Sequence, residues 1–453
     1  MHKFKRLACL LAVGMLSACG GGNSDTSTTQ PGTGSGGTPT PGISNTITAS
    51  VVQETMCGTV RNSSNAEILL HDQNWRVLSR LRADATGKIS GSISGSNLVN
   101  LSVISFSTTG EKEFQVNSYA QHPVGDIGTI VVPGKTSDGC ECRNVDVRVT
   151  SSYGALNPAT TQLTGFSSAE QRKTQAAFNE IVFEQVGLCR VTNGSWPLLT
   201  AVSNGGSANA IAASIKQYAV TGNIELSLNQ MASIIPVSLN TSNASLVETH
   251  YTESGLFGLR TRLYSNEIYV FNQLDGVTFV SIRAAENRVD TVDGTTVFRS
   301  ASQRQNITPP LTGPLSLNVP FSDAQESLER FLVQDLPSSN NNYNLGAVQG
   351  FNTFYLYAQT TLKDGTHYFQ SFIGPLQGTY PDEIVPADYG INNKFDDAAP
   401  STVSASVIRY GDSQSYQQFM SDQVERNKLS FEARMTGKWA KYSAVGIQVT
   451  TQR

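Results

Sequence analysis

Charged residues are scarce in this chain of 453 residues, of which only 15% are Asp, Glu, Lys or Arg. The 32 basic and 36 acidic side chains give a formal net charge of −4, and the basic residues form no run. Nucleic acids and anionic membrane surfaces are bound by clustered positive charge. The composition therefore argues against both as direct partners, and we expect no nucleic-acid binding.

Histidines and enzyme motifs are also scarce. The histidines beyond the first 18 residues are His71, His122, His250 and His367, and no two lie within four residues of each other. Zinc motifs such as H-E-x-x-H need closer spacing, so we predict no metal site and no cofactor. The sequence also contains no G-x-S-x-G, S-x-x-K or phosphate-binding loop, which favours a protein without catalytic residues. A Ser/His/Asp triad needs no sequence proximity, so an exported hydrolase is the alternative.

A long apolar run is the third absence, because beyond residue 18 none reaches the about 18 residues of a membrane-spanning helix. The run over residues 7–16 is also too short to span a bilayer. Lys3, Lys5 and Arg6 precede it and small residues follow, which is the order of an export signal. We therefore expect residues 1–18 to be a signal peptide and the rest of the chain to leave the cytoplasm.

The end of this segment, Leu16-Ser17-Ala18-Cys19, resembles the lipobox of bacterial lipoproteins. The resemblance implies cleavage before Cys19 and lipidation of that cysteine, and several acyl chains together anchor a protein stably. By the sorting rule of that family, Gly20 implies the outer membrane. A plain secretory signal with an incidental Cys19 is the alternative. Residues 19–45 are rich in Gly, Ser, Thr and Pro, which predicts a flexible tether.

Four cysteines remain beyond Cys19, namely Cys57, Cys140, Cys142 and Cys189. An even number in an exported protein predicts disulfide bonds. A bond between Cys140 and Cys142 would close a strained loop, so we expect each of them to bond Cys57 or Cys189, in either of two pairings. Zinc is the alternative, but zinc ligands usually come in two close pairs, and two of these cysteines stand alone.

The predicted fold class is mainly β with helical insertions. Residues 46–150 contain short alternating runs broken by Gly, Asn and Asp, which predicts an N-terminal β-sandwich. The strand around Cys57-Gly58-Thr59-Val60 and the turn from Asp84 to Gly87 resemble the transthyretin-like, carboxypeptidase-regulatory-like β-sandwich over residues 57–106. That module normally has no catalytic residues, so the resemblance implies scaffolding or binding.

Residues 151–240 are predicted to form a helical connector. Ser167 begins a capping box, and Phe178, Val182 and Val186 recur at helical spacing. A second helix is expected over residues 208–219.

Residues 241–453 are predicted to form a larger C-terminal β-rich domain with packed helices. The pairs Asp275-Gly276, Asp293-Gly294 and Asp364-Gly365 indicate hairpin turns. One helix is expected to begin at Ser322 and to turn Leu328, Phe331 and Leu332 inward. The other expected elements are a helix over 416–424 and strands over 429–435 and 439–450.

The hairpin around Asp364-Gly365 is the most specific candidate site. A two-residue turn there pairs Thr361 with Tyr368 and places tyrosines and amides on one face, with His367 on the core side. Such a face suits glycans, because aromatic rings stack on sugar C–H faces and amides bond hydroxyls. A hairpin buried on both faces is the alternative. The predicted ligand-binding residues are Tyr355, Tyr357, Gln359, Tyr368 and Gln370.

These patterns together predict an outer-membrane lipoprotein that acts as a binding or assembly module at the cell envelope. Its expected partners are the membrane, through the lipid on Cys19, and a glycan or an envelope protein. Besides the hydrolase, a further alternative is an accessory subunit of a secretion or appendage system, in which an edge strand extends a partner's sheet.

Overall fold

The computed structural model describes residues 46–93, 97–107, 112–165, 172–204, 210–216, 218–220, 222–252, 255–260, 266–292, 295–320, 324–336, 341–381, 385–395 and 401–451. The predictions for Cys19, the tether, Ser167, Ser322 and the Asp293-Gly294 turn lie outside these residues. Within them, every helix is too short or too polar to cross a membrane.

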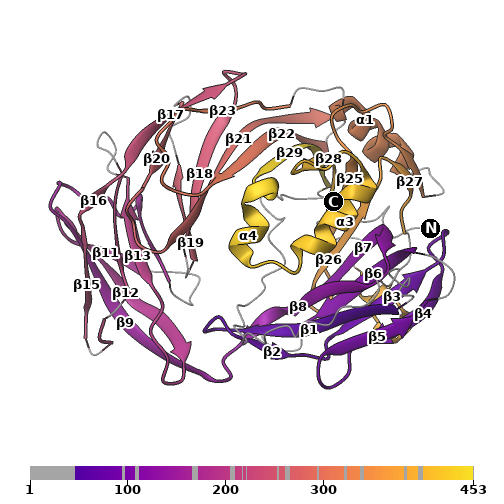
Figure 1. The fold of residues 1–453 in the computed structure, drawn as a ribbon, viewed down its shortest axis with the longest axis horizontal. Helices are drawn as coiled ribbons and strands as arrows, with labels where there is room; N and C mark the ends of the chain where they lie inside the picture. Colours follow the sequence, from indigo (N-terminus) through magenta and orange to yellow (C-terminus); the bar gives the residue numbers. More distant parts are fainter. Residues whose placement is uncertain are drawn as a thin grey trace, which may run out of the picture.

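A twelve-stranded sheet forms the centre of the molecule and curves around helices α3 (Tyr416–Arg426) and α4 (Phe431–Met435) (Figure 1). In spatial order its strands are β19 (Gly255–Arg260), β18 (Ser245–Thr252), β21 (Val277–Val292), β22 (Thr295–Ile307), β29 (Lys441–Thr451), β28 (Ser401–Tyr410), β25 (Thr353–Thr361), β26 (His367–Gly374), β7 (Glu113–Pro123), β6 (Leu98–Phe106), β3 (Ala66–His71) and β4 (Val77–Arg82).

Strands from both ends of the described chain share this sheet. β26 runs parallel to β7, from His367 opposite Glu113 to Ile373 opposite Tyr119. Backbone hydrogen bonds therefore join the predicted N-terminal sandwich to the predicted C-terminal domain. The prediction of a mainly β fold is confirmed.

The convex face of the sheet is buried in the main core. Phe354 and Leu356 of β25 pack there with Leu328, Phe331 and Leu332 from α1 (Ala324–Arg330) and η2 (Phe331–Asp335). Figure 1 shows α1 on the outer side of the curve. The predicted inward stripe of this helical segment is confirmed. Shorter elements of the same region are β17 (Ser233–Leu239), β20 (Glu267–Val270), β23 (Leu315–Leu317), β24 (Asn342–Asn344), β27 (Gln377–Thr379), η3 (Ala387–Tyr389) and η4 (Asn392–Lys394).

The N-terminal part of the chain adds a second layer to one end of this sheet. β1 (Thr46–Thr55), β2 (Val60–Asn62), β5 (Lys88–Ser92) and β8 (Asp126–Thr136) form a separate sheet. Ile47, Val51 and Ile89 from this layer share a core with Ile68 and Leu101 of the large sheet. This pairing of layers is a β-sandwich, in which apolar residues alternate with polar ones along each strand.

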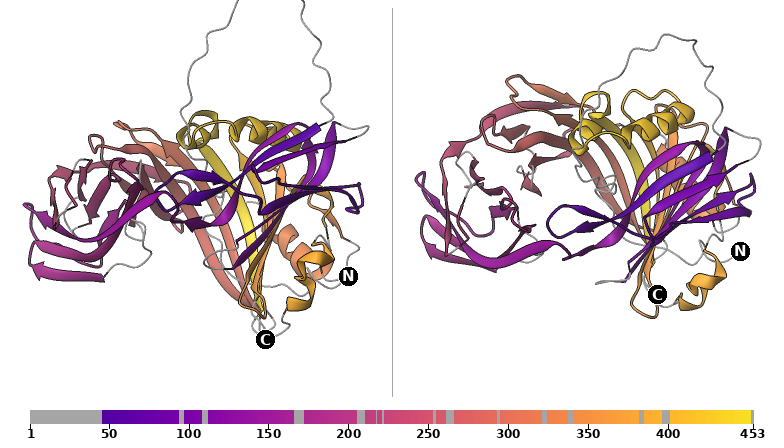
Figure 2. Two further views of the ribbon diagram at one scale, coloured as in Figure 1. Left: turned by 90° about the horizontal axis from the view of Figure 1, so that it is seen from below. Right: turned by 60° about the horizontal axis from the view of Figure 1, so that its bottom comes forward.

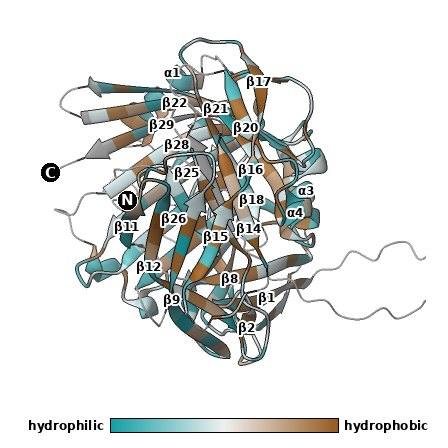
Figure 3. Ribbon diagram, turned by 90° about the vertical axis from the view of Figure 1, so that its left-hand side faces the viewer, coloured by the Kyte–Doolittle hydropathy of each residue, from teal (hydrophilic) through white to brown (hydrophobic). Residues whose placement is uncertain are grey.

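Residues 151–240 do not form a helical connector, and that prediction is wrong. The described residues from 151 to 231 belong to a second β-sandwich, which lies across the molecule from the first one (Figures 1 and 2), whereas β17 packs in the main core. Along its strands hydrophobic and hydrophilic residues alternate (Figure 3). Its strands are β9 (Cys140–Ser151), β10 (Thr161–Thr164), β11 (Arg172–Ala177), β12 (Glu180–Val191), β13 (Leu199–Ser203), β14 (Ile211–Ile215), β15 (Ile224–Leu228) and β16 (Gln230–Met231).

A β-bulge interrupts the alternation of inward and outward residues in β12. The pairing of β12 with β9 shifts between Phe183 and Val186, and Gln185 has a φ of +52°. The extra residue of a bulge changes which positions face inward. Ile181 and Phe183 before it and Val186 after it are therefore all fully buried, whereas Phe178 of the predicted helical stripe is 73% exposed.

The second expected helix, over residues 208–219, is wrong for a different reason. Ile211–Ile215 pairs along its whole length with Leu199–Ser203 of β13. The alanine-rich sequence favours a helix locally, but tertiary pairing overrides propensity.

The last predicted helix is confirmed, since α3 buries Tyr416, Phe419 and Met420. The predicted strand over residues 429–435 is wrong. Ser430 Oγ accepts a hydrogen bond from the Ala433 amide at 3.3 Å and caps the short helix α4 instead. β29 consequently pairs with β22 and β28.

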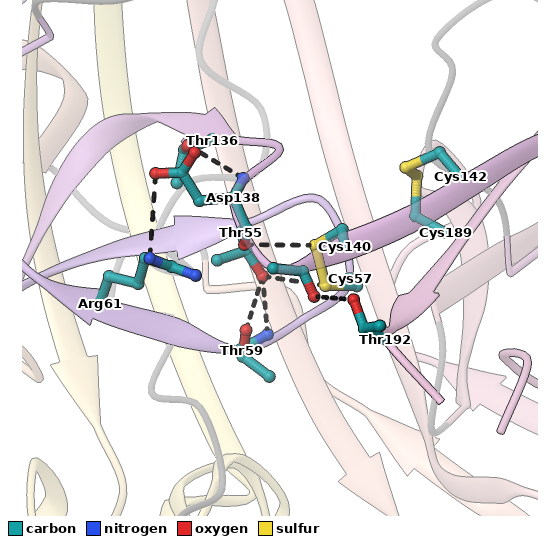
Figure 4. The surroundings of a disulfide bond; sticks show 11 residues. Thr55, Cys57, Thr59, Arg61, Thr136, Asp138, Cys140, Cys142, Cys189 and Thr192 are labelled. Carbon is teal, nitrogen blue, oxygen red and sulfur yellow. Dashed lines mark hydrogen bonds and ion pairs between the residues drawn. A yellow bond between two sulfur atoms is a disulfide. The ribbon is translucent and has the colours of Figure 1, made fainter. Parts of the chain in front are cut away.

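The prediction of two disulfide bonds is confirmed. Cys57 is bonded to Cys140, and Cys142 is bonded to Cys189 (Figure 4). Cys140 and Cys142 both lie at the start of β9. The two bonds therefore attach the first strand of the second sandwich to the segment between β1 and β2 on one side and to β12 on the other.

Candidate functional site

The hairpin formed by β25 and β26 has a different register from the predicted one. Thr361 lies opposite His367, and Thr360 lies opposite Tyr368. The Leu362 amide donates to the Thr366 carbonyl at 2.8 Å, and Gly365 has a φ of +80°. The turn thus contains three residues with a left-handed glycine at its end, and one extra turn residue shifts the pairing by one position.

Because side chains alternate between faces, this shift divides the predicted ligand-binding residues. Tyr368 and Gln370 are 2% and 4% exposed, and the Tyr368 hydroxyl donates to Gln370 Oε1 at 3.0 Å. These two residues belong to the convex side, so placing them on the ligand face was wrong. His367 was expected to face the core but is exposed.

Tyr355, Tyr357 and Gln359 remain together on the concave face and are partly exposed. The two tyrosine rings stack with centroids 6.4 Å apart and an angle of 16° between their planes. The Tyr357 hydroxyl donates to Gln359 Oε1 at 2.8 Å. Burial raises the pKa of Tyr355 and of Tyr357, so both phenols stay protonated at neutral pH. We call these three residues the tyrosine row.

A cavity of about 220 Å³ lies at the end of this row, and Tyr355 forms part of its wall. The concave face of the sheet makes one side of the cavity, and β8, α3 and α4 make the other. Figure 2 shows both helices lying across one end of the long strands. The sheet contributes a set of polar side chains to the wall: Ser105, Gln115, Asn117, Tyr119, Tyr355 and Ser371.

The sequence analysis missed the members of this set on β7. Gln115 and Asn117 alternate with the buried Phe114 and Val116, a pattern that indicates two different faces. Nothing in the sequence shows that β7 pairs with β26, which follows it by more than two hundred residues. Ser371 Oγ donates to Asn117 Oδ1 at 2.6 Å across this pairing.

Two buried arginines form part of the opposite wall. Arg426 and Arg434 are 7% and 9% exposed, and both line the cavity. Arg426 Nε donates to the Arg434 carbonyl at 2.8 Å, and Arg434 Nε donates to the Leu429 carbonyl at 2.7 Å. The Arg426 guanidinium also lies 4.5 Å from the centroid of the Tyr410 ring. Among the described residues that line the cavity there is no Asp or Glu.

A buried serine–histidine contact lies elsewhere in the sheet. His71 Nδ1 donates to the Trp75 carbonyl at 3.2 Å, and its Nε2 lies 2.9 Å from Ser102 Oγ, which also contacts Ser118. Burial lowers the pKa of His71 to about 4, and Ser102 is fully buried. A substrate has no access to this serine, which argues against a catalytic role. The contact instead links β3, β6 and β7 through side-chain hydrogen bonds. The described residues also contain no group of three metal-binding side chains.

Comparisons with known proteins add little. No family model and no curated protein matches this chain. A streptococcal ancillary pilin aligns with 61% of this chain and 99% of its own, at 9% identity and a TM-score of 0.12. SGBP-B of the Bacteroides ovatus mixed-linkage glucan utilization locus, in complex with a heptasaccharide, aligns over 88% and 93% at 10% identity and a TM-score of 0.10. Scores this low carry no argument about fold or function.

Proposed function

We propose that this protein is a carbohydrate-binding module of the cell envelope, held at the outer membrane by a lipid on Cys19. The observation that supports binding most is the tyrosine row, which leads along the concave face into the cavity. Its side chains are aromatic rings, amides and hydroxyls, which stack on and hydrogen-bond to sugars. The described residues of the cavity wall include no Asp or Glu and thus no carboxylate pair of the kind used in glycoside hydrolysis.

The size of the cavity limits what enters it. Pockets for drug-sized ligands measure about 300–1,000 Å³, and this cavity is smaller. It suits a single sugar residue at the end of a chain. The remainder of a glycan would lie along Tyr357 and Gln359, on the open part of the concave face.

The two disulfide bonds support a location outside the cytoplasm, where such bonds form and persist. The lipobox at Cys19 supports the membrane anchor. The predicted tether, residues 19–45, would keep the folded part clear of the bilayer surface.

Calorimetric titration of the purified mature chain with soluble neutral and acidic oligosaccharides tests this function. Tyr355→Ala and Tyr357→Ala should each weaken binding by at least about tenfold, because a stacking surface is lost. Tyr153→Ala is the matched control, since Tyr153 is 48% exposed and lies in the second sandwich. Absence of binding to every sugar, or equal losses in all three variants, would contradict the proposal.

A further inference from the structure

We infer that Arg283 of β21 and Arg304 of β22 bind an anionic group, a carboxylate or a phosphate, on the glycan that occupies the concave face. We call these two residues the concave arginine pair. The inference rests on the proposed function and specifies the class of glycan. It is carried by the placement of the two arginines, by the charges around them and by a second arginine pair on the other face of the same strands.

The two arginines lie side by side on the concave face of the sheet. Arg283 is directly opposite Arg304 in the antiparallel pairing of β21 with β22. Ile282 and Ala284, which flank Arg283 in the sequence, are buried in the main core on the convex side. Because side chains alternate between the faces of a strand and opposite residues share a face, both arginines belong to the concave side. Both are partly exposed, so a ligand has access to them.

Two tyrosines hold the guanidinium group of Arg304 in place. Its Cζ lies 5.1 Å from the ring centroid of Tyr442 and 5.7 Å from that of Tyr410, and Nη2 donates to the Tyr410 hydroxyl at 3.3 Å. Arg304 Nε is buried without a hydrogen-bond partner in the described part of the chain. Burial raises the pKa of Tyr442 to about 12, and the charges of Arg304 and Arg283 both oppose this rise. Both guanidinium groups therefore lie near the same phenol.

No described carboxylate balances these two charges. Burial lowers the pKa of Arg283, the charge of Arg304 lowers it further, and the group that opposes both effects is the Tyr442 phenol rather than any described Asp or Glu. Arginine nevertheless stays protonated in proteins. Like charges directly opposite each other destabilise a sheet, and their repulsion grows where water is partly excluded. An anion bound to both arginines would relieve this repulsion.

A second arginine pair on the same two strands has acidic partners. Arg288 of β21 lies directly opposite Arg299 of β22, on the convex face. Arg288 Nε donates to Asp290 at 3.0 Å, and Arg299 contacts the same carboxylate and also Glu329, the latter at 2.8 Å. Two carboxylates of the protein thus neutralise the convex pair. The concave pair has no such described partner, and the planar guanidinium group matches the paired oxygens of a carboxylate or phosphate ligand.

A line of small residues leads from the tyrosine row towards the concave arginine pair. From Tyr355 the sheet register crosses β28, β29 and β22 through Ser406, Gly446 and Ser300. All of these residues are partly exposed. Ser300 and Arg304 lie on the same face of β22, because an even number of positions separates them. A glycan that stacks on the tyrosine row can therefore cross the sheet here and place an anionic substituent at the arginines.

Thermal unfolding of the full mature chain with small probes tests the concave arginine pair. The probes are sodium phosphate, methyl α-glucuronide and neutral methyl α-glucoside, compared at equal concentration and equal ionic strength. We expect the two anionic probes to raise the thermal midpoint by about 1–2 °C, because a ligand that binds only the folded state stabilises it. The glucoside should leave the midpoint unchanged.

The variants separate an effect of this pair from a general effect of charge. Arg283→Gln should remove most of the shift caused by the anionic probes. Arg304→Lys keeps the charge but loses the guanidinium group, so it should keep part of the shift. Arg288→Gln is the matched control, since it removes an arginine of the same strand from the convex pair, and it should keep the full shift. Circular dichroism shows whether each variant is folded, and a misfolded Arg283→Gln leaves the comparison of Arg304→Lys with Arg288→Gln to decide.

Titration calorimetry with longer ligands tests whether the anion belongs to a glycan. Trigalacturonate should bind at least about tenfold more tightly than its neutral methyl ester, and Arg283→Gln should remove that difference. A phosphate shift without any preference for the acidic trisaccharide would indicate a site for a free anion and would overturn the assignment to a glycan.

The remaining outcomes distinguish the inference from the proposed function. Anion-dependent shifts that Arg283→Gln removes, together with the preference for trigalacturonate, support the inference. No shift with either anionic probe, or a shift that Arg283→Gln retains, overturns it. Binding of neutral oligosaccharides that Tyr355→Ala weakens would then leave the proposed function intact, whereas no binding of any oligosaccharide contradicts both.

Discussion

At the scale of single residues, buried histidines link this fold to pH. His250 and Glu248 are fully buried on β18, and His250 Nε2 donates to the Tyr269 carbonyl at 3.0 Å. Burial lowers the pKa of His250 to about 3 and raises that of Glu248 well above its usual value. Burial therefore favours the neutral form of each group, and Nε2 and the Glu248 carboxyl are 3.8 Å apart.

The lowered pKa values predict a loss of stability in acid. Below about pH 6.5 the unfolded histidine binds a proton that the folded one does not, so folding is weakened as pH falls towards the folded values of about 3 for His250 and about 4 for His71. Each histidine should contribute up to about 1.4 kcal/mol per pH unit. Urea unfolding from pH 7 to pH 5 measures the summed slope, to which the raised pKa of Glu248 contributes with the opposite sign.

His71→Asn should reduce the slope relative to the native chain, whatever its effect on stability at pH 7. His367→Asn is the matched control and should leave the slope unchanged, because His367 is exposed. Equal slopes for all three proteins would show that the buried histidine does not govern the acid response.

At the scale of elements, the alternation of apolar and polar residues predicted most strands. Helical spacing and capping residues predicted both larger helical segments near the C-terminus. It failed where one residue is added to a regular pattern. The bulge at Gln185 breaks the alternation of β12, and the three-residue turn that ends at Gly365 moves Tyr368 to the opposite face. The pairing of β7 with β26 was beyond reach, because the strands are distant in sequence and their alternation shows only that each has two faces.

The disulfide prediction shows a similar limit. Cysteine count and the strain of a C-x-C loop left two pairings open. The choice between them depends on β9 lying beside β12, with Cys142 opposite Cys189 in the register.

The bulge in β12 predicts a specific response to substitution. Gln185 has a positive φ, which β-branched residues avoid and glycine accepts. Gln185→Val should lower the free energy of unfolding by about 1–3 kcal/mol, and Gln185→Gly should change it little. Denaturant titration of the two variants provides the measurement. The same change at Gln175, an exposed residue of β11, is the control, and a comparable loss there would contradict strain as the cause.

At the scale of the whole molecule, the large sheet unites the two ends of the described chain and creates the site. The cavity needs β6 and β7 from the N-terminal part and β25, β26, α3 and α4 from the C-terminal part. Neither part forms it alone. The second sandwich lies away from this site and contributes no residue to the described wall of the cavity.

The proposed anchor predicts where the protein is found. Cys19→Ala should release the protein into the soluble fraction or leave it with an uncleaved signal, because the acyl chains have no attachment point. Fractionation of expressing cells, with an immunoblot for the mature chain, shows the distribution. Recovery of Cys19→Ala in the outer-membrane fraction at native levels would contradict lipid anchoring.

The central claim is that a ligand is held between the concave sheet face and the C-terminal helices. Hydrogen–deuterium exchange of the mature chain, with and without a saturating concentration of the oligosaccharide that binds most tightly in the calorimetric titration, tests it most directly. The account predicts slower exchange in β7, β25 and the segment from α3 to α4, with no change in the second sandwich. Protection confined to other elements, or no protection at all, would contradict it.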